Sequence, residues 1–267
     1  VPRDRKSEFE PVVVPKHQSR GLSIERLVIS LYAKGMSVSD IESEMQEIYG
    51  INLSTSAISI ITNKVSQAAS EWQNRPLESL YMIVWMDGIV FKVRENGKVI
   101  NKTVYLCVGL NKEGLKEVLG MWVGKNESAA FWMGVLTDLK ARGVEDILIT
   151  VTDNLNGFTE TIKSVFPTST TQICVVHQIR NSCRYVVWKE KKEFTSDLKN
   201  IYNAPTKEAA KMELENFEQK WGTKYPYAIR SWRNNWEELT VFFDFPVEIR
   251  KIIYTTNLIE NLNGKIR

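Results

Sequence analysis

The sequence has few cysteines, few histidines and no long apolar run. Its three cysteines among 267 residues are too few for the disulfide framework of a small secreted domain. No uninterrupted apolar stretch approaches the roughly 20 residues that a helix needs to cross a bilayer. The first part of the chain is charged and polar, so we expect no secretory signal there. These absences predict a protein of the reducing cytoplasm without a membrane partner.

The chain also lacks a large excess of either charge. It has 35 Lys and Arg against 32 Asp and Glu, which gives a formal net charge of +3. This slight basic balance permits binding to nucleic acid without requiring it. The composition is that of a globular protein with one large or two smaller domains. The chain begins on Val1 and ends within an apparent helix, so we expect a fragment of a longer protein.

Residues 1–21 are predicted to form an extended basic arm. This segment carries Arg3 and Arg5 together with three prolines, which oppose regular helix formation. Two interpretations fit the pattern. The arm is either a solvated linker, or a segment that follows a DNA backbone with its arginines.

Residues 22–76 are predicted to form three short helices. Ser23, Ser37 and Ser54 are suited to cap their first turns, and glycines end the first two. Short helices joined by tight turns are typical of a helix-turn-helix unit whose third helix contacts bases. A small dimerisation module has the same pattern, so both interpretations stay open here. The expected DNA contacts are Thr55, Asn63 and Lys64 in the third helix, with Arg3 and Arg5 in the arm.

From Leu80 the spacing of apolar residues changes from helical to strand-like. Two runs of strand-forming residues flank Asn96 and Gly97, and Asn-Gly is the strongest short hairpin signal. A third strand follows, and then a helix, a strand, a helix and a strand over 172–176. This order over residues 77–177 predicts an α/β fold of the ribonuclease-H-like class, with a mixed central sheet.

Strand patterns disappear after residue 177. Residues 178–250 carry helical patterns and four of the eight tryptophans, which predicts an all-α domain inserted into the α/β fold. One helix is predicted over residues 181–203, and Thr206 is suited to cap the next. We expect most of these aromatic side chains in the core of the inserted domain. Trp188 and Trp232 are the candidates for a DNA contact, provided that they are exposed. Residues 251–267 then return to the α/β fold as a final helix.

Two carboxylates stand out in the predicted sheet. Asp87 interrupts the first strand, where a buried carboxylate is costly unless it is paired or coordinated; an Asp at a bulge, bonded to backbone donors, is the alternative. Asp153 follows a buried strand, the usual place for catalytic groups in open α/β sheets. The first and fourth strands are neighbours in a sheet of this order, so cations are expected between the two carboxylates. Oxygen ligands suit Mg²⁺ or Mn²⁺, and two such ions can activate a nucleophile and stabilise a leaving oxygen.

Glu260 is the candidate for a third carboxylate. Asn257 precedes it by three residues, and Asn at the N-cap with Glu at N3 also resembles a capping box. Spacing alone does not decide between a cap and a catalytic residue.

Cys174 and His177 form a Cys-x-x-His motif with Cys183 nearby. A structural zinc site needs four ligands, and a chain with two histidines hardly supplies them. A partly buried histidine with a hydrogen-bond partner, near the edge of the sheet, is the simpler interpretation.

Several motifs together resemble one protein family. They are VPRDR at Val1, KVR after the Asp87 strand, KEVLG at Lys116, FW at Phe131, RGVEDIL at Arg142, Cys-x-x-His at Cys174 with IRN after it, KYP at Lys224 and YTTNLIE at Tyr254. With these motifs the chain resembles, over essentially its whole length, the transposases of bacterial insertion sequences in the Mutator-like family.

The resemblance implies a ribonuclease-H-like enzyme that cleaves DNA strands and transfers them. It places an Asp-Asp-Glu triad on Asp87, Asp153 and Glu260, holding two Mg²⁺ or Mn²⁺ ions. Cys174, His177 and Asn257 are then expected beside the triad, supporting its ligands or contacting a phosphate. The implied partners are double-stranded DNA, as terminal inverted repeats and target, and a second copy of the chain. The resemblance also implies that the protein acts at the bacterial nucleoid.

One segment departs from the family pattern. Asn154 follows Asp153 where glycine is commoner, although the carboxylate itself is kept. Two alternative functions stay open: a catalytically silent DNA-binding derivative, and a ribonuclease acting on RNA–DNA hybrids. The presence of all three carboxylates favours the transposase.

Overall fold

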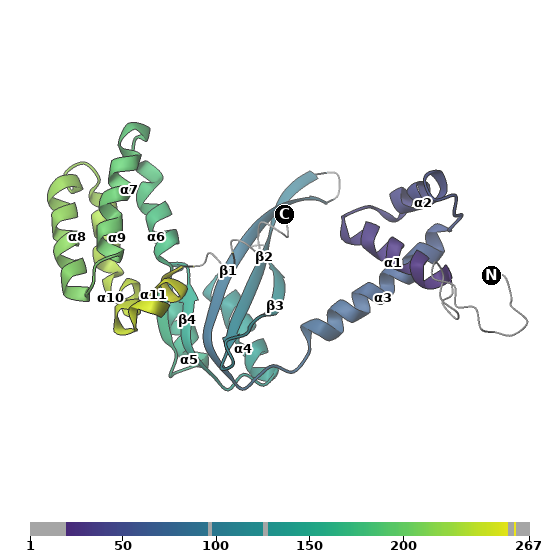
Figure 1. Cartoon of the computed structure of the whole chain (residues 1–267), viewed down its shortest axis with the longest axis horizontal. Coiled ribbons are helices and arrows are strands. Elements are labelled where there is room, and N and C mark those ends of the chain that lie inside the picture. The colour runs from purple at the N-terminus through teal and green to yellow at the C-terminus, as the bar shows by residue number, and fades with distance from the viewer. Residues whose placement is uncertain (1–19, 96–97, 125–127, 256–258, 260–267) are drawn as a thin grey trace, which may run out of the picture. The chain divides into compact units, whose positions relative to one another are not determined.

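The computed structural model describes residues 20–95, 98–124, 128–255 and 259 (Figure 1). The chain divides into two compact units, an N-terminal unit of residues 1–74 and a C-terminal unit of residues 75–267. No described helix is long and apolar enough to cross a membrane.

Three helices make up the described part of the N-terminal unit: α1 (Arg20–Ala33), α2 (Val38–Glu47) and α3 (Thr55–Gln73). Two of the predicted caps are present. The Ser37 side chain accepts the N–H of Asp40 in a complete capping box, and the Ser54 side chain caps α3. The predicted cap at Ser23 is wrong, because α1 already begins at Arg20. Apolar residues from all three helices, among them Val28, Ile41, Met45 and Ile58, form a small separate core.

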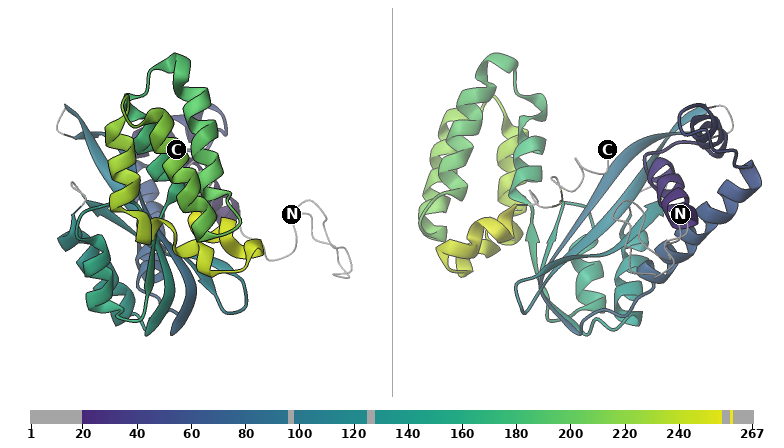
Figure 2. Two further views of the ribbon diagram at one scale, coloured as in Figure 1. Left: turned by 90° about the vertical axis from the view of Figure 1, so that its left-hand side faces the viewer. Right: turned by 45° about the vertical axis from the view of Figure 1, so that its right-hand side comes forward.

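A five-stranded mixed sheet forms the centre of the C-terminal unit (Figure 2). Its strands are β1 (Leu80–Glu95), β2 (Lys98–Asn111), β3 (Lys116–Gly124), β4 (Asp146–Thr152) and β5 (Thr170–Ile173), in the order β3-β2-β1-β4-β5. β1, β2 and β3 are antiparallel neighbours, whereas β4 runs parallel to both β1 and β5. This is the mixed central sheet that the order of the sequence patterns predicts.

Alternating side chains of β1 divide the core between the two faces of the sheet. On one face, Val84 and Met86 pack with α4 (Ala129–Ala141) and α5 (Phe158–Val165). On the other face, Trp85 and Ile89 belong to a cluster that continues into the C-terminal helices. Asp87 lies between Trp85 and Ile89 in this alternation, so it is on the face of the C-terminal helices.

Helices follow β5 almost without interruption. They are α6 (Val175–Ser182), η1 (Cys183–Tyr185), α7 (Trp188–Tyr202), α8 (Lys207–Trp221), α9 (Pro226–Asn234), α10 (Trp236–Leu239), η2 (Val241–Asp244) and α11 (Val247–Tyr254). Two predicted boundaries are wrong. The strand predicted to reach Val176 ends at Ile173, since Val175 already belongs to α6. The helix predicted to run through residues 181–203 is broken, because Val187 is extended (φ −62°, ψ 142°).

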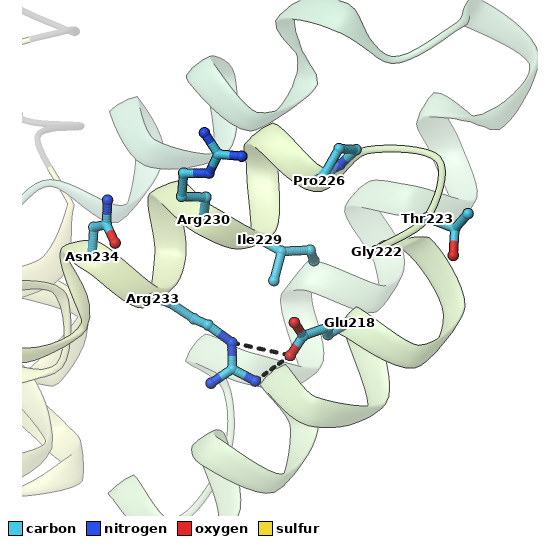
Figure 3. A pocket seen from close by; sticks show the side chains of 8 residues that line it. All are labelled: Glu218, Gly222, Thr223, Pro226, Ile229, Arg230, Arg233 and Asn234. Carbon is cyan, nitrogen blue, oxygen red and sulfur yellow. Dashed lines mark hydrogen bonds and ion pairs between the residues drawn. The ribbon is translucent and has the colours of Figure 1, made fainter.

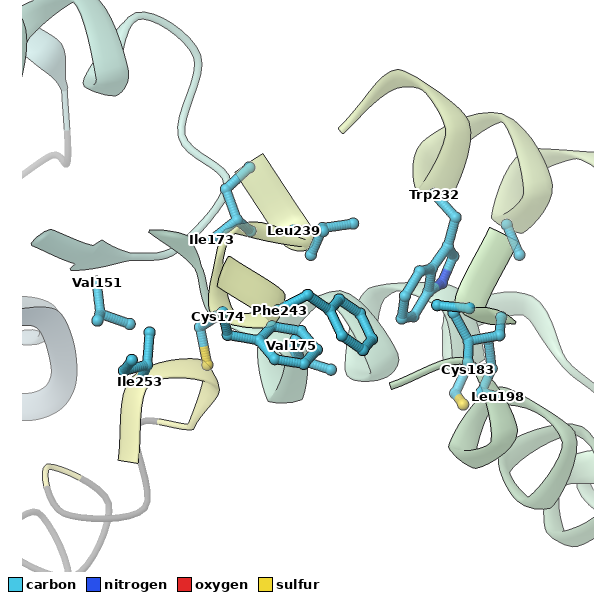
Figure 4. Packing of buried hydrophobic residues seen from close by; sticks show 14 of the residues in the cluster. Val151, Ile173, Cys174, Val175, Cys183, Leu198, Trp232, Leu239, Phe243 and Ile253 are labelled. Atoms are coloured by element: carbon cyan, nitrogen blue, oxygen red, sulfur yellow. The ribbon is translucent and has the colours of Figure 1, made fainter. Parts of the chain in front are cut away.

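The helical region is fastened to the sheet through a shared core (Figure 4). Val151 and Ile173 from the strands, Ile253 from α11 and Trp232 from α9 belong to one cluster of buried side chains. The buried side chain of Gln172 in β5 adds polar contacts. Its Nε2 donates to the carbonyl oxygen of Leu239 at 2.9 Å, and its Oε1 accepts the N–H of Phe242 at 2.8 Å. Sheet and helices therefore belong to one compact unit.

Candidate functional site

The register of two adjacent parallel strands leads Asp87 and Asp153 to the same level. Its last pair is Trp85 of β1 with Val151 of β4, and each carboxylate follows two residues after its member of that pair. Asp153 is the first residue beyond β4, at the carboxyl end of that strand. The sheet thus brings together two acidic residues that are 66 positions apart in the sequence.

Both carboxylates are removed from bulk water to different degrees. The Asp87 side chain is buried, and its Oδ1 accepts the N–H of Gly88 at 2.9 Å. Asp153 is half-buried, with its Oδ1 atom inside the protein. Negative charges at neighbouring buried positions repel each other more strongly than they do in water, because the local dielectric constant is lower. A cation bound between Asp87 and Asp153 would offset this repulsion.

Cys174 and His177 lie at the start of α6, beside these carboxylates. Cys174 is fully buried, and its N–H donates to the carbonyl oxygen of Thr152 at 2.8 Å, directly before Asp153. A hydrogen bond with the Cys174 side chain and the charges of Asp87 and Asp153 raise the pKa of His177 to about 9, although burial opposes this. These interactions favour the positively charged form of the imidazole, close to both carboxylates.

The third predicted carboxylate, Glu260, lies outside the described residues, as does Asn257. Their neighbour Ile259 is fully buried in the cluster that contains Trp85 and Val151. No group of three or more His, Cys, Asp and Glu side chains able to hold a metal ion occurs in the described ranges. Asp87 and Asp153 fit a divalent cation by the chemistry of their donors, since carboxylate oxygens are the ligands that Mg²⁺ prefers.

The predicted DNA contacts of the N-terminal unit are exposed where they are described. Thr55, Asn63 and Lys64 lie on the surface of α3, whereas Arg3 and Arg5 are outside the described residues. The Lys64 ammonium forms an ion pair with Glu25 at 2.7 Å. The neighbouring Thr62 is buried, and its hydroxyl donates to the Ser59 carbonyl oxygen at 3.1 Å, so it does not contribute to the exposed face.

The structure also contains a groove that sequence reasoning missed (Figure 3). It is open to solvent and lies between the end of α8 and the start of α9. It is lined by Glu218, Gly222, Thr223, Pro226, Ile229, Arg230, Arg233 and Asn234. The guanidinium of Arg233 binds the Glu218 carboxylate across it. The spacing of Arg230 and Arg233, three residues apart on one helix, is the signal that could have indicated this groove. Neither Asp87 nor Asp153 lines it.

Comparisons with known proteins agree over the whole chain. The sequence model described as "Transposase, Mutator family" matches residues 1–267. A probable transposase for an ISRM3-like insertion sequence element from Sinorhizobium fredii is 46% identical, over 100% of this chain and 67% of that protein. The transposase for insertion sequence element IS905 from Lactococcus lactis is 32% identical, over 100% of this chain and 68% of that protein.

A solved structure of low similarity was also found. It is the Drosophila P element transposase strand transfer complex, with a TM-score of 0.26 and 11% identity, over 62% of this chain and 50% of that chain. A likeness of this size carries no argument about the arrangement of this chain.

Proposed function

Because this chain belongs to the Mutator family of transposases, we propose that it cuts and joins DNA at insertion-sequence ends with Asp87, Asp153 and Glu260 as its catalytic carboxylates. Family membership confirms the resemblance that the sequence motifs indicate and the transposase function that it implies. The roles of the individual residues are proposals.

The observation that carries the assignment is the shared level of Asp87 and Asp153 on adjacent strands. The order and directions of the five strands support a ribonuclease-H-like interpretation of the sheet. Ile259 directly precedes Glu260 and is buried in the same cluster as Trp85 and Val151. This position supports Glu260 as the third member of the triad. Asn257 is proposed to stand beside this triad.

Asp87, Asp153 and Glu260 would hold two Mg²⁺ or Mn²⁺ ions. Such ions, when bound, increase the nucleophilicity of an attacking oxygen and stabilise the charge on a leaving oxygen. The chain itself positions the DNA. His177 would donate a hydrogen bond to a phosphate oxygen, and the Cys174 side chain would hold the imidazole in place. The first turn of α6 adds backbone N–H groups, which favour an anion at a helix N-terminus.

The N-terminal unit is proposed to be a helix-turn-helix domain that recognises double-stranded DNA at the element ends. Its exposed Thr55, Asn63 and Lys64 on α3 support this proposal, with Arg3 and Arg5 following the backbone of the duplex. The partners are then the terminal repeats, the target DNA and a second copy of the chain. Dimerisation through this unit without DNA binding is the alternative.

Metal-dependent nicking tests the proposal directly. We expect the protein to nick a labelled duplex that carries an element end in Mg²⁺ or Mn²⁺, and to lose this activity in EDTA. Binding of the end without any nicking would identify a catalytically silent derivative. Preferential cleavage of an RNA–DNA hybrid of the same sequence would identify a ribonuclease.

A further inference from the structure

Three large aromatic side chains at or near the connection between η1 and α7 are exposed to solvent. Trp188 is 87% exposed, Tyr185 is 63% exposed and Tyr227, at the start of α9, is 52% exposed. The Tyr185 and Tyr227 rings meet edge to face with centroids 5.5 Å apart. Large aromatic side chains clustered on a surface indicate a binding site, because each loses favourable burial by staying in water.

The aromatic cluster is held by a rigid support. The Tyr225 hydroxyl donates to the Glu190 carboxylate at 2.5 Å and accepts the N–H of Val187 at 3.3 Å. Lys224 pairs with the same carboxylate. Val186, two residues before Trp188, is buried in the core shared with the sheet. The connection is thus joined to the turn before α9 through Tyr225, which also contacts Glu190 of α7.

The segment that carries Tyr185 and Trp188 is basic. Residues 184–192 include four basic side chains and one acidic side chain, a net charge of +3. The acidic residue is Glu190, which Lys224 already neutralises. The Arg184 guanidinium lies 5.6 Å from the centre of the Tyr185 ring. Aromatic rings interleaved with basic side chains suit a nucleic-acid strand, whose bases stack while its phosphates contact the cations.

From these observations we propose that Tyr185, Trp188 and Tyr227 form a stacking surface for unpaired bases of the DNA strand flanking the cleavage position. The bases have to be unpaired or terminal, because those inside a duplex are already stacked on their neighbours. This inference rests on the proposed function, since it takes the strand to pass from the carboxylates to the helical region.

Helix α6 sets the distance between the stacking surface and the carboxylates. The chain runs from His177 along α6 and η1 to Tyr185. At about 1.5 Å per residue in an α-helix and about 2.0 Å in a 3₁₀-helix, this path is roughly 13 Å long. A strand that keeps duplex spacing rises about 3.4 Å per nucleotide and an unpaired strand can extend further, so the surface is expected to contact bases within about four nucleotides of the cut.

The test compares two substrates and three variants of the full chain. The first substrate is a fully paired duplex, and the second is the same duplex with about four unpaired nucleotides on one strand. The variants are Trp188→Ala, Trp188→Phe, and Met212→Ala as a control. Met212 is also exposed in the helical region, on α8. The affinity for each DNA substrate is measured by fluorescence anisotropy, and the molar mass of the protein in solution is measured by light scattering.

We expect Trp188→Ala to weaken binding of the unpaired substrate about tenfold while changing binding of the paired duplex little, because one base loses its aromatic partner. Trp188→Phe should restore most of the affinity, and Met212→Ala should bind as the wild type does. Addition of the unpaired substrate should also quench the tryptophan fluorescence of the wild type more than that of Trp188→Phe. Equal affinity of Trp188→Ala and wild type for the unpaired substrate would overturn the proposal. A changed mass with unchanged DNA binding would identify an interface between protein copies instead.

Asp87→Asn separates the two proposals. It is expected to abolish nicking and to keep the preference for the unpaired substrate. If wild-type protein nicks DNA but Trp188→Ala binds normally, the stacking surface is wrong and the proposed function stands. If no nicking occurs but the Trp188 effect is present, the catalytic assignment fails and the stacking surface stands.

Discussion

The indole N–H of Trp85 donates a hydrogen bond of 3.2 Å to the carbonyl oxygen of Ile252, 167 residues later in the chain. This bond joins β1, two residues before Asp87, to α11. Both residues lie close in sequence to a proposed catalytic carboxylate, since Glu260 follows Ile252 by eight positions. The chain leading to Glu260 is therefore attached to the strand that carries Asp87.

Trp85→Phe is expected to reduce the rate of nicking more than a control substitution that lowers stability by a similar amount. The change removes the bond to Ile252 and leaves a small cavity, so the free energy of unfolding should fall by about 1–3 kcal/mol. Trp132→Phe is the matched control, because Trp132 is equally buried on the other face of the sheet. Chemical denaturation and nicking assays on both variants check this. Similar nicking by the two variants would contradict a role of Trp85 in placing the segment that carries Glu260.

Asp87→Asn, Asp153→Asn and Glu260→Gln are each expected to abolish strand cleavage with little effect on binding of the element ends. Without metal, thermal stability of the Asp87 and Asp153 variants should change little, since the relief of repulsion between neighbouring carboxylates is offset by lost attraction to the His177 imidazole. Glu145→Gln, at an exposed position before β4, is the control that should keep full activity. A variant that still nicks at the wild-type rate would remove its residue from the proposed triad.

Two substitutions in the ion pair of the N-terminal unit should change DNA affinity in opposite directions. Lys64→Ala is expected to weaken binding to all DNA sequences. It should also reduce the slope of log binding constant against log salt concentration by about one unit. Glu25→Gln removes the partner that competes for the Lys64 ammonium, so it should strengthen binding. Stability should barely change, because exposed ion pairs contribute at most about 1 kcal/mol. Titrations at several salt concentrations check this, and unchanged affinity in both variants would contradict a DNA contact by Lys64.

Asn63→Ala is expected to relax discrimination at one base pair without altering the salt dependence. Its amide carries no charge but can form paired hydrogen bonds with a base edge, so its loss should affect sequence preference alone. Competition binding with single-base variants of an element end measures this. A uniform loss across all variants would indicate a phosphate contact in place of a base contact.

The contact between Glu190 and its partners should make stability depend on pH. Hydrogen bonds from Lys224 and then Tyr225 lower the pKa of Glu190. A carboxylate with a lowered folded-state pKa stabilises the protein above its unfolded-state pKa, near 4.5, and this contribution is lost as pH falls through the folded-state value. Glu190→Gln should therefore lower the melting temperature at pH 7 and have progressively less effect below about pH 4. The same temperature difference at pH 7 and pH 3 would show that the ionised carboxylate is not responsible.

Local signals were sufficient for many features of this protein. Ser37, Ser54 and Thr206 cap helices as predicted, because a cap depends on a side chain and a backbone N–H only a few residues apart. The strands were predictable from the apolar, β-branched runs, and Asp87 and Asp153 from their places in those runs. These features depend on neighbours along the chain, which the sequence contains directly.

The tertiary structure alone distinguished Trp188 from Trp232. Both tryptophans lie in helical, partly basic segments, and the sequence marked both as candidates for a DNA contact. Trp232 is 1% exposed and its indole N–H donates to the Ser182 hydroxyl at 2.9 Å, so it does not meet the condition of exposure, whereas Trp188 is 87% exposed. The spacing of apolar residues shows that a helix has a buried face. Which distant helix covers that face depends on packing between segments that the sequence does not place side by side.

The common level of Asp87 and Asp153 was decided in the same way. The sequence determined that each acidic residue stands in or directly after a strand, and the predicted strand order made the two strands neighbours. Only the pairing of Trp85 with Val151 sets the register that brings the carboxylates level. A slip of one residue would have turned one carboxylate to the opposite face. That register depends on the packing of both faces of the sheet, which no local pattern in the chain contains.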